Sequence, residues 1–246
     1  MSDIDNKKVE LFFSNAVAKH QDENAVLDVA DGQQHANIYR NYFTLHYILK
    51  IISADKHKTI LDFGCGVGRI SKQMASMSAE VIGADTNQQM INVAVKNSGD
   101  EKNLSYYQLT AFNIPLADKY FDCTFSHWVF QHINDSESVL WLKEIKRTLK
   151  SDGRIVLFEQ VKNESLQSEK HFFRSVSHYE KLIAEAGLKL HSAFPVMRVP
   201  SRGMWLWNKF PEIKFLLPFC YLIDQVTLNR KPEIADYFTY CFELGT

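Results

Sequence analysis

The sequence is poor in the features that mark several classes of protein. It has four cysteines among 246 residues, and they are widely spaced, with no C-x-x-C pair. This spacing favours neither a disulfide framework nor a zinc site, and it suits a reduced compartment. The formal net charge is −1, and no long run of lysine or arginine occurs. Bulk attraction for nucleic acid is therefore lacking, and we do not expect a nucleic-acid substrate.

Long apolar runs and targeting signals are also scarce. No uninterrupted apolar stretch is long enough to cross a bilayer. The first ten residues are polar and lack the basic-then-apolar layout of a secretion signal, so we expect a cytoplasmic protein without a transmembrane segment. Hydrophobic residues make up 46% of the chain, enough for a sizeable core, and one main α/β domain is the simplest interpretation.

The most informative feature is an apolar strand that runs into three alternating glycines. Residues 60–71 read ILDFGCGVGRIS, which places Gly64, Gly66 and Gly68 just before a helical pattern. Glycines here allow positive φ and close approach of the backbone to a ligand, which would also meet the free N–H groups of the helix. A second strand ends at Asp85, about 20 residues after the first glycine, where an acid can accept hydrogen bonds from ribose hydroxyls. The pattern predicts a nucleotide-cofactor site.

Two residues distinguish between the kinds of nucleotide cofactor that such a loop can bind. A dinucleotide loop of the form G-x-G-x-x-G needs a third glycine at position 69, where Arg69 stands. Asp62 extends the run to D-x-G-x-G-x-G, and with it the chain resembles the class I S-adenosylmethionine-dependent methyltransferases. The resemblance continues through LTAFNIPL at 109–116, YFDCTFSHWVFQHI at 120–133 and LKSDGRIVLFE at 149–159. One departure is Thr110, where the family often has aspartate.

The resemblance implies an α/β fold. We expect a Rossmann-like, doubly wound sheet of seven strands, mostly parallel with one antiparallel edge strand, flanked by helices on both faces. The last two strands, near 188–196 and 235–244, should form the antiparallel pair at that edge. The expected division is an N-terminal helical cap over 1–57, a core over 58–198 and 233–246, and an aromatic-rich insertion over 199–232.

The resemblance also implies a set of cofactor contacts. The glycine loop would pass under the methionine part of S-adenosylmethionine, with Asp62 near its amino group and Asp85 holding its ribose. Arg40 is a candidate partner for the cofactor carboxylate, with a solvated surface arginine as the alternative. No metal is expected. The full predicted set is Arg40, Asp62, Gly64, Cys65, Gly66, Gly68, Asp85, Thr86, Met90, Ala111, Phe112 and Ser126.

Catalysis needs a base only where the acceptor loses a proton early. His127 is the first candidate, since it follows the fourth strand and an imidazole titrates near working pH, at about 6.5. His132 is its rival, and either residue is alternatively a structural histidine. Glu159 is predicted either to orient the acceptor or to form a buried ion pair. Residues 160–175 are predicted either as a mobile lid, from which His171, Phe172 and Arg174 would touch substrate, or as a plain surface loop.

The segment 203–226 carries an unusually aromatic and apolar load for a connection. It is interpreted as a packed cap over the acceptor pocket, as a homodimer interface, or as a surface that contacts lipid. The cap is favoured, because large apolar patches rarely stay exposed in soluble monomers.

The predicted function is methyl transfer from S-adenosylmethionine to an oxygen or nitrogen of a small-molecule acceptor, with release of S-adenosylhomocysteine. A sugar, a lipid-linked intermediate and a secondary metabolite are all candidate acceptors. Two alternatives compete with this prediction. Arg69 argues against an NAD(P)-dependent oxidoreductase, while the intact glycines and Asp85 argue against a catalytically silent cofactor-binding subunit of a methyltransferase complex.

Overall fold

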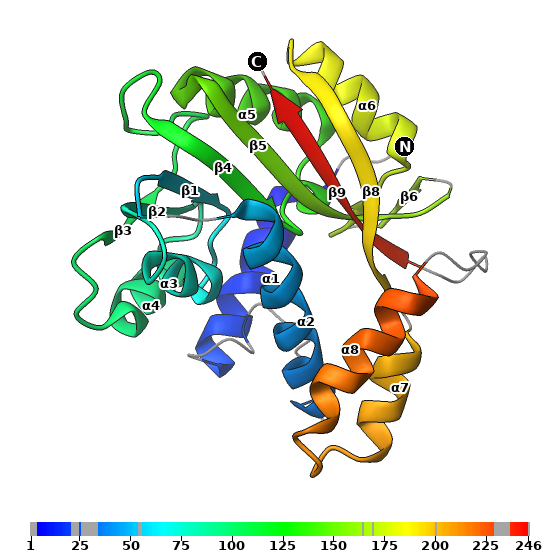
Figure 1. Ribbon diagram of the computed structural model, residues 1–246. Coiled ribbons are helices and arrows are strands. Elements are labelled where there is room, and N and C mark those ends of the chain that lie inside the picture. The colour runs from blue at the N-terminus through cyan, green and yellow to red at the C-terminus, as the bar shows by residue number, and fades with distance from the viewer. Residues whose placement is uncertain are drawn as a thin grey trace.

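The computed structural model describes residues 4–20, 25, 34–53, 56–163, 165–168, 170–199, 201–228 and 237–245. Parts of the predicted cap (1–57), of the insertion (199–232) and of the last core segment (233–246) lie outside these residues. Helices and strands alternate along most of the chain (Figure 1). The helices are α1 (Asn6–Lys19), α2 (Gln34–Ile52), α3 (Arg69–Ala75), α4 (Gln88–Ser98), α5 (Asp135–Thr148), α6 (Val176–Glu185), α7 (Arg202–Lys209) and α8 (Leu216–Thr227).

One sheet of seven strands organises the molecule, in the order β3-β2-β1-β4-β5-β9-β8. The first five strands are parallel to one another, and β9 runs antiparallel to both β5 and β8. The expected mostly parallel sheet with an antiparallel pair at one edge is confirmed. The strands are β1 (Thr59–Phe63), β2 (Glu80–Asp85), β3 (Leu104–Gln108), β4 (Phe121–His127), β5 (Leu149–Val161), β8 (Lys189–Val199) and β9 (Tyr237–Gly245).

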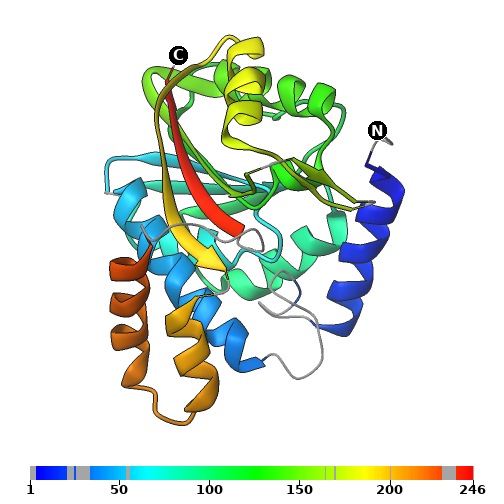
Figure 2. The same cartoon turned by 90° about the vertical axis from the view of Figure 1, so that its right-hand side faces the viewer.

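Alternate residues of the central strands enter two separate hydrophobic clusters, one on each face of the sheet. In β1, Leu61 and Phe63 pack with residues of α5 and α6, whereas Ile60 packs with residues of α2, α3, α7 and α8. Figure 2 shows these helices on the two sides of the sheet. A parallel sheet covered on both faces has nearly continuous apolar strands, which explains why the sequence of β1 lacks a polar face.

The strand order reverses at β1, which has β2 on one side and β4 on the other. In a doubly wound sheet the crevice lies outside the carboxyl ends of the strands at this switch point. Asp62, Asp85 and His127 stand at or next to these ends. The topology therefore brings Asp62, Asp85 and His127 together, although they belong to three strands and the first and last are 65 positions apart in sequence.

Helix α1 is attached at both ends to the rim of this crevice. The Ile4 N–H donates to Asn134 Oδ1 at 2.7 Å, and Asn6 Nδ2 donates to Glu137 Oε1 at 2.8 Å. At the other end, Asn87 Nδ2 donates to Ser14 Oγ at 3.1 Å, and Val17 joins a small hydrophobic cluster with residues of α4. The helix thus bridges α4 and the segment after β4.

Helices α7 and α8 form a hairpin that packs against α2. The Tyr39 hydroxyl of α2 donates to Asp224 of α8, and the Gly203 N–H of α7 donates to the same carboxylate at 2.6 Å. Trp207 Nε1 donates to the His35 carbonyl oxygen at 2.6 Å. Among the described residues, no helix combines the length and the apolar character needed to span a membrane.

Candidate functional site

A cavity of about 720 Å³ lies at the carboxyl ends of the central strands. Most of the residues predicted from the sequence line it, although they come from α2, the loop after β1, the end of β2, α4, the turn after β3 and the segment after β4. The predicted residues that line the cavity are Arg40, Asp62, Gly64, Cys65, Gly66, Asp85, Thr86, Met90, Ala111, Phe112, His127 and His132. Gly68 and Ser126 do not line it: Gly68 immediately precedes α3, and Ser126 is fully buried within β4.

The glycine loop has the backbone conformation that its sequence predicts. Gly64, Gly66 and Gly68 have φ values of 75°, 54° and 75°. A Cβ on Gly64 would lie 2.3 Å from Val129 Cγ2, and a Cβ on Gly68 would lie 2.2 Å from the Tyr106 hydroxyl oxygen. Both the conformation and the space require glycine. The loop therefore forms a glycine cradle: it packs closely against Val129 and Tyr106, and Gly64 and Gly66 line the cavity with backbone alone.

Asp85 is held at the end of β2 by the backbone around it. Its Oδ2 accepts from the Gly66 N–H and its Oδ1 from the Asn87 N–H, both at 2.9 Å. Asn87 in turn caps α4 by accepting from the Gln89 and Met90 N–H groups. Burial raises the pKa of Asp85, whereas the hydrogen bonds from these N–H groups favour the carboxylate and oppose that rise. Each oxygen keeps a further lone pair with which it can accept from a ligand.

Asp62 lies behind the glycine loop and is almost fully buried. Ser71 Oγ donates to its Oδ2 at 2.6 Å. Burial raises the pKa of Asp62 to about 7, while Ser71 and the positive charge of Arg69 oppose that rise. Arg69 itself donates to Asn41 Oδ1 at 2.5 Å and lines the cavity. A cationic ligand group near Asp62 would stabilise the ionised carboxylate.

The turn after β3 is a strained element at the cavity. Ala111 and Phe112 both have positive φ, 53° and 52°, and the Asn113 N–H donates to the Thr110 carbonyl oxygen at 3.0 Å. Non-glycine residues in this conformation are uncommon and concentrate at functional sites. The Phe112 ring packs against Trp141, with the ring centres 5.2 Å apart. The turn thereby presents an apolar edge to the cavity beside the buried Met90.

The two candidate bases differ in their hydrogen-bond partners. His127 Nε2 lies 2.6 Å from the Tyr47 hydroxyl oxygen. Burial raises the pKa of Tyr47 above its usual value and lowers that of His127 well below its usual value, so both side chains are neutral. His127 Nε2 is therefore occupied by Tyr47, as acceptor or as donor according to the imidazole tautomer.

His132 has the opposite arrangement. Its Nδ1 lies 2.8 Å from the Lys170 carbonyl oxygen, which can only accept, so Nδ1 carries the hydrogen. Burial lowers the pKa of His132 to about 4, with His171 contributing, and the neutral ring leaves a lone pair on Nε2. Gln131 Nε2 lies 3.3 Å from that atom as a weak donor. Of the two candidate bases, His132 is therefore the one whose Nε2 makes the weaker hydrogen bond within the protein, 3.3 Å against 2.6 Å.

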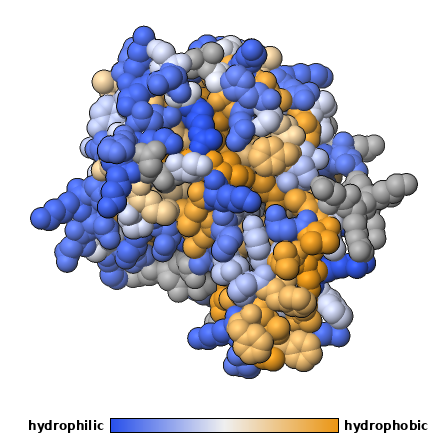
Figure 3. Space-filling view, viewed as in Figure 1, coloured by the Kyte–Doolittle hydropathy of each residue, from blue (hydrophilic) through white to orange (hydrophobic). Residues whose placement is uncertain are grey.

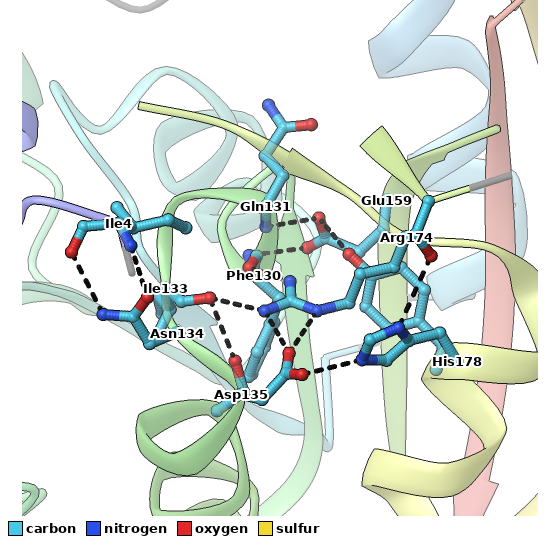
Figure 4. Close-up of polar contacts among 12 residues, drawn as sticks. Ile4, Phe130, Gln131, Ile133, Asn134, Asp135, Glu159, Arg174 and His178 are labelled. Atoms are coloured by element: carbon cyan, nitrogen blue, oxygen red, sulfur yellow. Dashed lines mark hydrogen bonds and ion pairs between the residues drawn. The ribbon is translucent and has the colours of Figure 1, made fainter. Parts of the chain in front are cut away.

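Two buried charged side chains, Glu159 and Arg174, fix the segment that carries His132, and Arg174 forms an ion pair with Asp135 at 2.7 Å (Figure 4). Glu159 is fully buried, and its carboxylate accepts from the N–H groups of Val129, Phe130 and Gln131 at 3.0 to 3.3 Å. Arg174, also fully buried, donates to the carbonyl oxygens of Phe130 and Ile133 at 2.6 Å.

Three residues of the segment 160–175, His171, Phe172 and Arg174, would touch substrate if that segment were a lid. Glu159 and Arg174 hold the cavity wall in place and neither lines the cavity, so the prediction that Arg174 touches substrate is wrong. Phe172 is buried and does not line the cavity either, whereas His171 does. Residues 166–173 include the short strand pair β6 (Leu166–Gln167) and β7 (Phe172–Phe173).

The cavity also has lining residues that the sequence did not predict, and five of them come from α1. Their signal was the helical spacing of apolar residues at 9, 12, 13 and 17, within a region predicted as an N-terminal helical cap without named site residues before Arg40. No residue of α7 or α8 lines the cavity, so the favoured interpretation of 203–226 as a cap over the acceptor pocket is wrong for the described residues. The unpredicted lining residues include Asn6, Val9, Glu10, Phe12, Phe13, Gln131, Glu137 and Gln160.

Comparison with known proteins places the chain among methyltransferases. A family model described as a methyltransferase domain matches residues 61–157. The ubiquinone/menaquinone biosynthesis C-methyltransferase of Vibrio cholerae is 25% identical over 237 residues, which cover 94% of this chain and 80% of that protein. The ubiquinone biosynthesis O-methyltransferase of Sinorhizobium fredii is 24% identical over 175 residues, covering 64% of this chain and 71% of that protein.

A solved structure shares the fold. The S-adenosylmethionine-dependent methyltransferase of Leishmania major superposes with a TM-score of 0.68 at 16% identity, covering 97% of this chain and 82% of the other. The glycine cradle, the carboxylate at the end of β2, the strand order and the matched family model agree with one another. The chain belongs to the class I S-adenosylmethionine-dependent methyltransferases and is an enzyme of that type.

Proposed function

We propose that this enzyme transfers a methyl group to the hydroxyl oxygen of a small aromatic molecule, a phenol. The observation that carries the proposal is His132, which lines the cavity with its Nδ1 fixed on the Lys170 carbonyl oxygen and its Nε2 accepting only a long contact, 3.3 Å, from Gln131 Nε2. A phenol fits this site better than a sugar hydroxyl, because an imidazole with a pKa of about 4 is a weak base and needs an acidic proton.

For the cofactor, we propose the contacts that the resemblance implies. Bound S-adenosylmethionine would supply a methyl group on a sulfonium already activated for displacement. Asp85 would accept from the ribose hydroxyls with its remaining lone pairs, and Asp62 would face the amino group. Arg40, which lines the cavity from α2, would pair with the carboxylate. The strained turn at Ala111 and Phe112 would flank the adenine.

The acceptor half of the cavity supports an aromatic ring. Phe12 and Phe13 line it from α1, and Trp128 and His171 line it from the segments after β4 and β5. The Phe13 ring packs edge-on against His132, with the ring centres 5.1 Å apart. Aromatic walls favour a flat apolar acceptor through stacking and edge contacts. They offer few of the hydrogen bonds that a sugar would require.

Gln131 adds a polar group for orienting the acceptor. Its side chain is 4% exposed, and its Oε1 is a buried oxygen without a hydrogen-bond partner. In Figure 4 this side chain points away from the Glu159 and Arg174 cluster, and the residue lines the cavity. An acceptor that carries a second hydroxyl or amine would donate to this oxygen and relieve the cost of its burial.

A second candidate is methyl transfer to a ring carbon of the same kind of acceptor. It is favoured by the similarity to the Vibrio cholerae C-methyltransferase. Loss of the hydroxyl proton to His132 gives a phenolate, which is nucleophilic at oxygen and at the neighbouring ring carbons. The same residue would therefore start both reactions, and the position of the ring relative to the methyl group would select the product. After methylation at a ring carbon, that carbon would also lose its hydrogen as a proton to water, which restores the aromatic ring.

The test has two stages. Calorimetric titration with S-adenosylhomocysteine first establishes that the purified enzyme binds the cofactor product. Turnover with methyl-labelled S-adenosylmethionine is then measured on a panel of phenols, aliphatic alcohols, sugars and amines. We expect transfer to phenols, with the product bond identified by NMR.

Two variants test the role of His132. His132→Gln should lower kcat by about 10²- to 10⁴-fold, the usual contribution of a general base, and leave S-adenosylhomocysteine affinity unchanged. His191→Gln, at an exposed histidine of β8, is the matched control. Transfer only to amines or sugars would overturn the phenol proposal. Binding without turnover on any acceptor would favour the silent-subunit alternative.

A further inference from the structure

We propose that the outer face of the α7–α8 hairpin docks on the surface of an anionic phospholipid bilayer. The hairpin carries six of the fourteen large hydrophobic side chains that are exposed among the described residues. Phe215 is 80% exposed, Val226 74% and Trp205 60%. Figure 3 shows this apolar surface at the end of the molecule formed by α7 and α8. The six residues are Trp205, Phe210, Phe215, Phe219, Leu222 and Val226.

The exposed face belongs to a firmly attached element. On its inner face, Asp224 accepts from the Tyr39 hydroxyl and from the Gly203 N–H, and Trp207 is buried with its Nε1 on the His35 carbonyl oxygen. A Cβ on Gly203 would lie 2.2 Å from the Cys220 carbonyl oxygen, so the two helices cross at close range. The contacts of the inner face thus hold the hairpin in place, so its outer apolar side chains cannot become buried by a movement of the hairpin toward the core.

The size of the face exceeds what single exposed residues explain. Four of its six members are aromatic, each with roughly 150–250 Å² of surface. With about half or more of each side chain exposed, the face reaches several hundred Å², the size at which exposed patches mark interaction sites.

Charge selects lipid as the occupant. Arg202, Lys209 and Lys214 are exposed on the hairpin, against Glu212 as the exposed acid, since Asp224 is buried. Lys209 Nζ lies 4.0 Å from the centre of the Trp205 ring. Aromatic and aliphatic side chains with neighbouring lysines suit a bilayer surface, where rings enter the headgroup region and cations meet anionic lipid. A second copy of this chain would instead bring a further set of the same cations to the contact.

The hairpin is connected to the catalytic cavity through α2. Tyr39 holds the hairpin through Asp224, and the next residue, Arg40, lines the cavity. Docking would therefore hold the cavity at the bilayer through a rigid connection. The inference does not depend on which acceptor the enzyme methylates.

Flotation with phospholipid vesicles tests the proposal on the full-length protein. We expect at least tenfold stronger partition to vesicles of phosphatidylglycerol and phosphatidylcholine than to phosphatidylcholine alone. Phe215→Ser combined with Phe219→Ser should lower partition at least tenfold, and Lys209→Gln combined with Lys214→Gln should remove the preference for anionic vesicles. Leu140→Ser, at an exposed apolar residue of α5, is the matched control.

Two further measurements separate the outcomes. Unchanged S-adenosylhomocysteine affinity shows that the variants are folded, and a blue shift of Trp205 fluorescence on vesicles, absent in Trp205→Phe, places the hairpin in the lipid. Failure of the wild-type protein to float, or equal flotation of the double phenylalanine variant, would overturn the proposal. Dimerisation in analytical ultracentrifugation that the same variant abolishes would overturn it in favour of a second copy.

Discussion

Substitution of Gly64 by alanine tests the cradle at the centre of the cavity. At Gly64 φ is +75°, a conformation that costs an alanine about 1–2 kcal/mol. The added Cβ would also lie 2.3 Å and 2.8 Å from the two methyl carbons of Val129, well inside contact distance. Overpacking of this kind typically costs about 1–3 kcal/mol. We therefore expect Gly64→Ala to lower the free energy of unfolding by about 2–5 kcal/mol.

Two companion variants separate the backbone contribution from the clash. Gly187→Ala also places alanine at positive φ, 72°, but its Cβ would meet only Lys146 Nζ, at 3.4 Å. It should cost about 1–2 kcal/mol. Val129→Ala removes both methyl carbons and leaves Val129 Cβ, 3.1 Å from a Cβ on residue 64, as the nearest contact. In that background, Gly64→Ala should cost no more than Gly187→Ala.

Urea denaturation of the four proteins in the double-mutant cycle gives the coupling between positions 64 and 129. We expect a favourable coupling of about 1–3 kcal/mol, because neighbours that clash are not additive. S-Adenosylhomocysteine affinity should fall in Gly64→Ala and recover in part in the double variant. A coupling near zero, or equal costs for Gly64→Ala and Gly187→Ala, would refute the packing of this loop against Val129.

Three other predictions concern the buried charges. Asp85→Asn should weaken S-adenosylmethionine binding by about 1.5–3 kcal/mol in calorimetric titration, because charged hydrogen bonds to the ribose are lost, and unchanged affinity would remove Asp85 from the ribose site. The pKa of Asp62 is about 7, and the ammonium of a bound cofactor would lower it. The affinity for S-adenosylmethionine should therefore rise as the pH increases from 5 to 7 and then level off. This pH dependence should be absent in Asp62→Asn. Arg174→Met should lower the free energy of unfolding by about 3–5 kcal/mol in urea, since Asp135 and two carbonyl oxygens lose their donor and Glu159 loses a neighbouring positive charge; a change below about 1 kcal/mol would contradict the clamp.

The cofactor side of the site could be predicted because its determinants are local. The glycines need positive φ within one loop, and Asp85 is held by N–H groups at positions 66 and 87 of adjacent turns. Such requirements leave a signature in a short stretch of sequence. The mostly parallel sheet was predictable for the same reason, since β1, β2 and β4 are each followed by a helix before the next strand. The roles assigned to the cofactor residues stay predictions until binding is measured.

The acceptor side could not be predicted because its determinants are far apart in sequence. Helix α1 reaches the cavity through contacts with Asn134 and Glu137, at separations of 130 and 131 residues. His127 and His132 look equivalent in sequence, yet Tyr47 engages one and the Lys170 carbonyl oxygen fixes the other. Arg174 sits in a polar segment, and its complete burial is explained by partners 39 to 44 residues away, which are Asp135 and the carbonyl oxygens of Phe130 and Ile133.

The two aromatic residues of α1 that line the cavity differ in their contacts with the cofactor half. Phe13 packs against a cluster that contains Val67 of the glycine loop and Met90 of α4, whereas Phe12 contacts Phe13 and Lys170. Substitution of Phe12 can therefore change the shape of the acceptor site without removing a direct contact with the glycine loop. Acceptor preference should respond to Phe12→Leu while cofactor affinity stays constant, whereas Phe13→Leu should change both, because only Phe13 packs against the cofactor half.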